Sequence, residues 1–154
     1  DVILVGEVRD PETAATAVRA AETGHLVLAT LHSSGVVDTL LRIQGILGEA
    51  AGITTGLLAQ QLIGIISQQL LPRLDGGLVA ILEYFQNEGA TRKWVAEGKH
   101  TELQDQLERG DGETACSLLR YLVAATRQNV LDPDTARAAC PRPQDFDRAM
   151  KGIS

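Results

Sequence analysis

Four apolar residues, Val2 to Val5, open the chain and lead through Gly6 directly to the carboxylate Glu7. An unbroken apolar run of this length is typical of a strand buried on both faces, the usual state of a strand in a parallel sheet. Such a strand ends where its sheet meets solvent. The sequence therefore favours an α/β fold with an acidic group at one edge of the sheet.

The residues that follow continue a strand–helix–strand pattern. Asp10 before Pro11 predicts the start of a helix and Gly24 its end, so that the helix covers residues 11–23. A second apolar run, HLVLATLH, occupies residues 25–32 and has the composition of a buried strand. Two strands joined in this way form a right-handed βαβ unit with parallel strands.

Helix is predicted for most of the remaining chain. Residues 36–71 are expected to form two helices, separated near Gly48 to Gly52, with Pro72 closing the second. A strand is predicted at residues 77–85, after an Asp-Gly-Gly turn, and only helices are predicted after Glu88.

A change of character near Glu88 predicts two domains. Residues 1–88 form the α/β part, and residues 89–154 consist of short amphipathic segments that glycine and proline interrupt. Breaks at Pro141 and Pro143 predict a loosely packed C-terminal tail.

Charge and composition exclude several classes of protein. The 154 residues include 14 basic and 20 acidic ones, a net charge of -6 without a basic block, which argues against direct binding to nucleic acid. The most apolar stretch, residues 57–71, contains four glutamines and is too polar to cross a bilayer. Cys116 and Cys140 lie far apart and are expected to be reduced structural thiols in a cytoplasmic protein.

Both short strands end in candidate catalytic groups. The first delivers Glu7, and the second delivers Thr30 and His32. Ligands of parallel sheets bind outside the carboxyl ends of the strands, where a carboxylate can orient a water, accept its proton or hold a metal through water. An imidazole at the same edge can bond a developing oxyanion.

Structural interpretations compete with the catalytic ones. Glu7 can simply complement the dipole of the following helix, and on residue pattern alone this is as good an interpretation as catalysis. His25, directly after Gly24, is expected to bond the last helix carbonyls. His32 and its following serines can form a helix cap, and Arg9 with Asp10 can serve as turn and cap.

The sequence of residues 1–34 resembles that of the PilT/GspE-like secretion ATPases, which are hexameric P-loop motors of type IV pili and type II secretion. ILVGE is similar to the family's Walker B strand, and TGHLVLATLH is similar to its His box. The resemblance continues more weakly through GIISQQLLPRLDGG and ATRKWVAEGK. It implies the C-terminal part of a RecA-like P-loop ATPase core, from the Walker B strand onward, built on the parallel βαβ unit and followed by a small helical subdomain.

The resemblance also implies roles for single residues. Glu7 matches the Walker B glutamate, which activates or orients the hydrolytic water and helps to organise Mg²⁺, here through water. His32 matches the His-box histidine that reports on the γ-phosphate of ATP. The residues expected to bind or support the nucleotide are His25, Arg9 and Thr30.

One required motif is missing from these residues. A P-loop ATPase needs GxxxxGK[ST], whose backbone amides and lysine cradle the phosphates. Gly98 and Lys99 are followed by His100 instead of Ser or Thr, and Lys93 stands where the first glycine belongs. The family carries this motif before the Walker B strand, so we expect it before Asp1 and expect this part of the motor to be inactive by itself.

The function implied by the resemblance is ATP hydrolysis, with Mg²⁺, that powers type IV pilus retraction and twitching motility. The implied partners are a homo-hexamer, an inner-membrane platform protein and the pilin machinery. The implied location is the cytoplasmic face of the bacterial inner membrane, with peripheral attachment and no direct contact with nucleic acid.

Two features favour the retraction branch of the family. Two unpaired cysteines cannot form the tetracysteine zinc module that assembly and secretion ATPases commonly carry. ATRKWVAE, residues 90–97, aligns with the retraction helix AIRNLIRE and matches it at Ala90, Arg92 and Glu97. For this segment, an ordinary packing helix anchored by Trp94 and Val95 is the competing interpretation.

The function of the whole protein also has open alternatives. They are a type II secretion or pilus assembly ATPase, a type IV secretion ATPase, and a non-catalytic interaction fragment.

The missing phosphate cradle leads to a binding prediction. Residues 1–154 alone should bind Mg-ATP weakly or not at all, because only the water-activating side of the site is present. Isothermal titration measures this directly, and a dissociation constant below about 1 µM, about -8 kcal/mol, would contradict it.

Overall fold

The computed structural model describes residues 1–48, 53–110 and 112–152. The chain forms two compact units, Asp1–Ile65 with Gln86–Asp105 and Ile66–Phe85 with Gln106–Ser154. Each unit contains residues from both sides of the predicted boundary near Glu88. The assignment of residues 1–88 to an ATPase core and of residues 89–154 to a helical subdomain stays a prediction.

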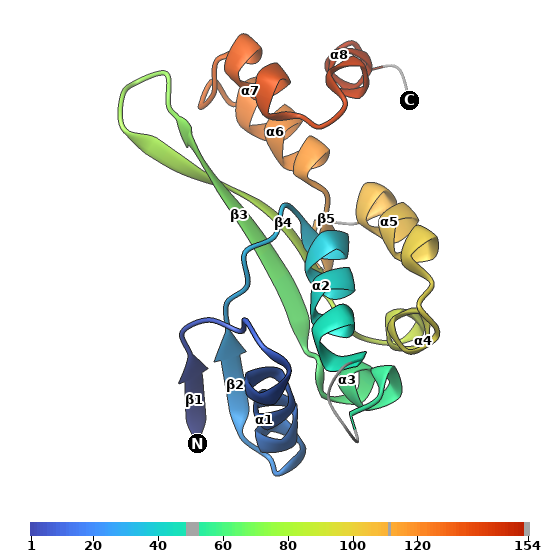
Figure 1. The fold of residues 1–154 in the computed structure, drawn as a ribbon. Coiled ribbons are helices and arrows are strands. Elements are labelled where there is room, and N and C mark those ends of the chain that lie inside the picture. Colours follow the sequence, from blue (N-terminus) through green and yellow to red (C-terminus); the bar gives the residue numbers. More distant parts are fainter. Residues whose placement is uncertain (49–52, 111, 153–154) are drawn as a thin grey trace. The chain divides into compact units, whose positions relative to one another are not determined.

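The first unit is built on a parallel pair of strands. Strands β1 (Val2–Val5) and β2 (Leu26–Ala29) pair in the register Val2↔Leu26 to Val5↔Ala29, and helix α1 (Pro11–Glu22) connects them (Figure 1). The predicted βαβ unit is therefore confirmed. Helix α1 ends one residue before the expected position, and Gly24 follows with a φ of 92°, a conformation that glycine adopts without strain.

One face of this strand pair is exposed. The side chains of Val2 and Leu4 are 63% and 73% exposed, and Leu26 and Leu28 lie open on the neighbouring strand. Alternate residues of a strand point to opposite faces, and α1 packs against β2. The prediction that the strand is buried on both faces is therefore wrong for these residues, because the face that carries Val2, Leu4, Leu26 and Leu28 is left open among the described residues.

Helices complete the first unit. They are α2 (Val36–Gly48), α3 (Thr55–Gln61), α4 (Ala90–Glu97) and the start of α5 (His100–Arg109). Val36, Leu40 and Leu47 recur at helical spacing on α2 and are buried, which fixes one face of this helix in the unit. Residues 49–52, where the break between the two predicted helices falls, lie outside the described residues.

A buried asparagine ties α3 to α4. Asn87, 2% exposed, donates from Nδ2 to the carbonyl oxygens of Ala59 and Leu62, both at 2.9 Å. Its Oδ1 accepts from the Thr91 hydroxyl at 3.2 Å. Both ends of this amide are thus satisfied, as burial of a polar group requires.

The second predicted helix ends at Gln61, and residues expected to continue it form strand β3 (Gly64–Pro72). This strand makes a hairpin with β4 (Leu78–Gln86), whose predicted position is confirmed (Figure 1). The hairpin turn contains Gly76 and Gly77 with φ of 95° and 77°, values that favour glycine. Pairing across this turn is a non-local interaction, and it overrides the helical appearance of the β3 sequence.

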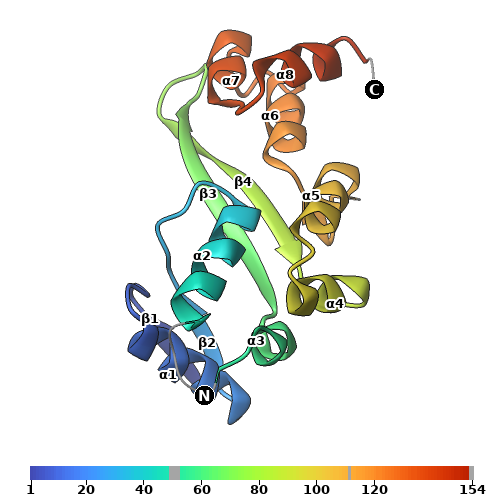
Figure 2. The same cartoon turned by 45° about the vertical axis from the view of Figure 1, so that its right-hand side comes forward.

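The second unit packs three helices against the hairpin. These are α6 (Leu118–Arg127), α7 (Pro133–Ala139) and α8 (Pro143–Met150), and α7 lies beside the hairpin turn (Figure 2). One cluster of buried core residues in this unit consists of Ile81, Leu118, Leu122, Val123, Ala125, Leu131, Ala136, Cys140 and Phe146. A short strand, β5 (Ala115–Cys116), pairs antiparallel with β4 and is an exception to the prediction of helix alone after Glu88.

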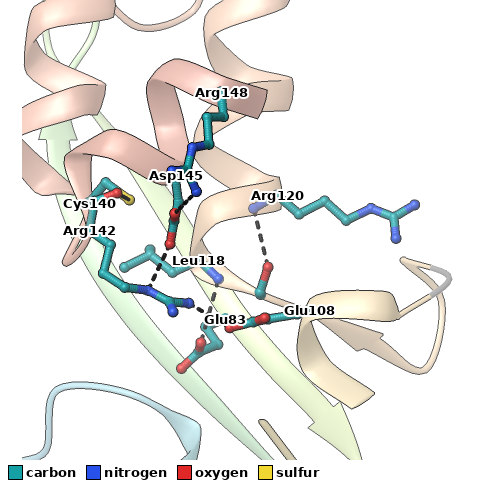
Figure 3. A network of polar contacts seen from close by, with 9 residues as sticks. Glu83, Glu108, Leu118, Arg120, Cys140, Arg142, Asp145 and Arg148 are labelled. Carbon is teal, nitrogen blue, oxygen red and sulfur yellow. Dashed lines mark hydrogen bonds and ion pairs between the residues drawn. The ribbon is translucent and has the colours of Figure 1, made fainter. Parts of the chain in front are cut away.

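The C-terminal helix of this unit is anchored. Arg142 Nη2 lies 2.6 Å from Glu108 Oε1, and Arg142 Nε lies 2.9 Å from Asp145 Oδ2 (Figure 3). Phe146 is buried in the core, so the prediction of a loosely packed tail is wrong. Proline begins α8 at its first turn, where its missing N–H costs nothing, and it does not interrupt packing.

Both cysteines are buried free thiols, as predicted. Burial raises the pKa of the Cys116 thiol, which keeps it protonated and unreactive. Among the described residues, no helix combines the length and apolar character needed to span a membrane.

The Asn87 contacts predict a stability effect. Asn87→Ala removes this donor from the carbonyls of Ala59 in α3 and of Leu62 at its C-cap, and should lower the free energy of unfolding by about 1–3 kcal/mol. Urea unfolding measures this, with Gln86→Ala, at an exposed neighbouring position, as the control. Equal stability of the two variants would show that Asn87 does not hold α3 to α4.

Candidate functional site

Backbone and side-chain bonds join the two segments that follow β1 and β2. The Val8 amide donates to the Thr30 carbonyl at 2.9 Å, which continues the contact between the segments beyond the ends of the strands. The Thr30 hydroxyl donates to the Gly6 carbonyl. These bonds hold the residues that leave the two strands side by side, as the parallel sheet requires.

Glu7 lies at the centre of this edge, between a guanidinium and an imidazole. Arg9 Nη2 pairs with Glu7 Oε2, and His32 Nε2 lies 3.4 Å from Glu7 Oε1. The Glu7 side chain is 22% exposed, whereas that of His32 is 82% exposed. The structure therefore brings Glu7, Arg9, Thr30 and His32 together at one edge, with the carboxylate the more protected group.

Neighbouring charges keep Glu7 ionised. The hydrogen bond from Arg9 is the largest effect on the pKa of Glu7 and lowers it. Desolvation comes next and raises this pKa, and the electrostatic interactions with Arg9, His32 and Arg42 each lower it by less. The Glu7 carboxylate in turn raises the pKa of Arg9. At neutral pH the edge holds a carboxylate that accepts hydrogen bonds and has little tendency to take up a proton.

Asp10 is the N-cap of α1. Its Oδ1 accepts from the Thr13 amide at 2.8 Å, and its Oδ2 accepts from the Thr13 hydroxyl at 2.8 Å. These bonds from Thr13 lower the pKa of Asp10. The cap is therefore fully present above the ordinary pKa of an aspartate and is lost as pH falls through the lowered value in the folded chain.

His25 lies at the other end of β2. Its Nδ1 is 3.2 Å from the Ala20 carbonyl and 3.2 Å from the Thr23 hydroxyl, which agrees with the expected bond to the last carbonyls of α1. Five residues of extended chain, about 16 Å, separate His25 from Thr30. The structure does not bring His25 to Glu7, and a role of His25 in supporting nucleotide stays a prediction.

Side chains after His32 fix the start of α2. The Ser34 amide and hydroxyl both donate to Asp38 Oδ2, at 2.8 and 3.1 Å. The Thr39 hydroxyl donates to the Gly35 carbonyl at 2.6 Å, so its hydrogen is used and Ser33 is the donor in their 2.6 Å contact. These bonds tie Ser33 and Ser34 to the first turn of α2, and the interpretation of the serines as a helix cap stays a prediction.

The small effect of Arg42 on the pKa of Glu7 has no signal in the sequence. Arg42 belongs to α2, and only the packing of α2 beside α1 brings its charge within range of Glu7. Sequence reasoning therefore missed it.

The donor set at this edge fits a metal only in part. Within the described ranges, no three His, Cys, Asp or Glu side chains are grouped so that they could hold a metal ion. Mg²⁺ in phosphate sites is bound by one or two carboxylates, and water and substrate phosphates complete its coordination. Glu7 fits such a role through water, whereas both oxygens of Asp10 are used in the helix cap.

Comparison with known families gives a match over most of the chain. The family model described as "Type II/IV secretion system protein" matches residues 1–134. These residues include both strands of the parallel pair and the side chains of Glu7, Arg9, Thr30 and His32, which together are called the Glu7 edge.

Individual relatives agree with this match. The chain is 40% identical over 140 residues to a twitching motility protein of Neisseria gonorrhoeae, an alignment that covers 89% of this chain and 37% of the relative. It is 32% identical over 147 residues to the type IV pilus retraction ATPase PilT of Pseudomonas aeruginosa, which covers 95% of this chain and 43% of that protein. The chain thus spans about two fifths of the length of these relatives.

A solved structure confirms the fold class. The crystal structure of the pilus retraction motor PilT with bound ADP superimposes with a TM-score of 0.83 at 37% identity, over 96% of this chain and 42% of that one. The mixed α/β architecture with parallel strands, predicted from the first residues, is therefore that of an ATPase domain.

The two histidines give a paired stability test. His25→Ala should lower the free energy of unfolding by about 0.3–1 kcal/mol because it removes a contact at the end of α1. His32→Ala should change it by less than about 0.5 kcal/mol, since the His32 side chain is exposed. Thermal and urea unfolding of both variants measure this, and a large loss in His32→Ala would mean that His32 supports the fold rather than a ligand.

Proposed function

Because the chain belongs to the type II/IV secretion system protein family, we propose that it forms the water-activating side of the ATP site of a motor that powers type IV pilus retraction. The observation that carries this proposal is the Glu7 edge. A protected, ionised carboxylate and an exposed imidazole lie 3.4 Å apart at the ends of two paired parallel strands.

Glu7 would orient the attacking water. Phosphoryl transfer requires mainly positioning and charge stabilisation from a protein, so a carboxylate that accepts a hydrogen bond from water suits the reaction. The lowered pKa of Glu7 makes it a weak base. It would therefore align the water and receive a proton only as the bond to phosphorus forms.

His32 and Arg9 would act beside it. The exposed imidazole of His32 is free to turn from Glu7 toward a γ-phosphate oxygen and to donate a hydrogen bond there. Arg9 would keep Glu7 charged and in place through their ion pair. Thr30, whose hydroxyl bonds the Gly6 carbonyl, would hold the two segments together and support the nucleotide indirectly.

The remaining half of the site would come from sequence outside these 154 residues. The chain has no GxxxxGK[ST] motif, and phosphates need such a cradle of backbone amides and a lysine. Bound Mg²⁺ would neutralise phosphate charge, and Glu7 would contact it through water.

We also propose the setting in which the motor works. It would be a homo-hexamer at the cytoplasmic face of the bacterial inner membrane, peripheral to the bilayer, acting on a pilus platform protein and on pilin. The support is the similarity over 89% and 95% of the chain to a twitching motility protein and to a pilus retraction ATPase.

Glu7→Gln tests the proposed role in the complete motor. The amide keeps the size of the side chain and loses its charge, so ATP binding should persist while turnover falls by about 10²- to 10⁴-fold. Nucleotide binding by titration and phosphate release by a coupled assay measure the two quantities.

Glu12→Gln is the matched control for this experiment. It makes the same change at an exposed position in the first turn of α1 and should leave turnover unaltered. Normal turnover in Glu7→Gln would reduce Glu7 to a residue that complements the helix dipole.

A further inference from the structure

We propose that Gln44 is a positioning residue that couples the His32 segment to the junction between α4 and α5. This inference rests on the proposed function, because it assumes that nucleotide acts at Glu7 and His32. It concerns contacts within the first unit alone, and the motifs that resemble the ATPase family do not include Gln44.

Helix α2 is connected to the candidate site through the residues that precede its first turn. Helix α2 begins four residues after His32, and the intervening residues are bound to its first turn by the side chains of Asp38 and Thr39. Val36 and Leu40 bury one face of the same turns. A displacement of the His32 segment must therefore move the start of α2 with it or break these bonds.

Gln44 lies further along the same helix. It lies eight residues beyond Val36, about 12 Å along the helix axis. Gln44 Nε2 donates to the Val95 carbonyl at 3.0 Å, and Gln44 Oε1 lies 2.9 Å from His100 Nε2. One amide thus contacts the last turn of α4 and the first residue of α5.

Chemistry fixes the orientation of this amide. The Val95 carbonyl only accepts hydrogen bonds, so the NH₂ group of Gln44 must face it. The oxygen of Gln44 then faces His100, whose Nε2 must carry a proton and donate. Both contacts are made at once only when α2, α4 and α5 keep this arrangement.

The contacted segment is the C-terminal end of α4. The Val95 carbonyl accepts from the Gly98 amide at 3.4 Å, so Gln44 supplies a second donor to it, and the Ala96 carbonyl accepts from the Thr55 hydroxyl at 3.1 Å. Gly98, with a φ of 67°, turns the chain from α4 into α5. Gln44 therefore binds a helix end where a small change of backbone angle redirects the next helix.

Hydrogen–deuterium exchange in the complete motor tests the coupling. With Mg²⁺ and a non-hydrolysable ATP analogue, exchange should slow by about threefold or more at residues 30–39 and at residues 95–100 in the unaltered protein. Gln44→Leu should retain the change at residues 30–39 and lose it at residues 95–100, with the affinity for the analogue within about threefold of normal.

A structural role alone gives a different result. If Gln44 only stabilises α4, Gln44→Leu raises exchange at residues 95–100 but leaves the nucleotide-dependent difference there, which would overturn the proposal. Gly45→Ala, at an exposed neighbouring position of α2 with no atom near the added methyl, should leave both responses normal.

Two further outcomes separate this proposal from the proposed function. A response at residues 30–39 without one at residues 95–100 in the unaltered motor overturns the coupling alone. Absence of analogue binding and of any response overturns the proposed function, and the coupling with it. Should Gln44→Leu not fold, Gln44→Asn gives the same test, because its amide is about 1.5 Å shorter and cannot reach both partners.

Discussion

The candidate site depends on the parallel pairing of β1 with β2. This pairing sets Val5 beside Ala29, and the bond from the Val8 amide to the Thr30 carbonyl carries the contact past the strands. As a result Glu7 and His32, which are 25 positions apart in the sequence, leave the sheet at the same edge. A slip of one residue in this register would turn Glu7 to the other face of the sheet and separate the two side chains.

The charges at this edge are arranged around one protected carboxylate. The hydrogen bond from Arg9 is the main cause of the lowered pKa of Glu7, to which Arg42 adds only a small effect, while His32 stays exposed and able to change partner. Because these groups lie close to solvent, salt weakens their mutual attraction. Binding of a nucleotide and closure of the site would strengthen the same interactions, since they would then act in a less polar surrounding.

Local signals made part of this structure predictable. The Asp-Pro start and glycine end of α1, and the two apolar runs, give the βαβ unit and hence the positions of Glu7 and His32. Non-local interactions decided what was missed. Strand β3 exists because it pairs across the Gly76-Gly77 turn, and the charge of Arg42 reaches Glu7 only through packing of α2. Burial alternates along β3, but its residues Ile65 to Leu71, IISQQLL, do not alternate between apolar and polar types, so the sequence carried no period-two signal for this strand.

A structure of the complete motor with Mg²⁺ and a non-hydrolysable ATP analogue tests the central claim most directly. The distances to measure run from Glu7 to the water nearest the γ-phosphate and from His32 Nε2 to a γ-phosphate oxygen. If these strand ends form the hydrolytic side of the site, both distances should be at most about 3.2 Å. A γ-phosphate bound more than about 8 Å from both side chains, beyond the reach of one bridging water, would contradict the claim.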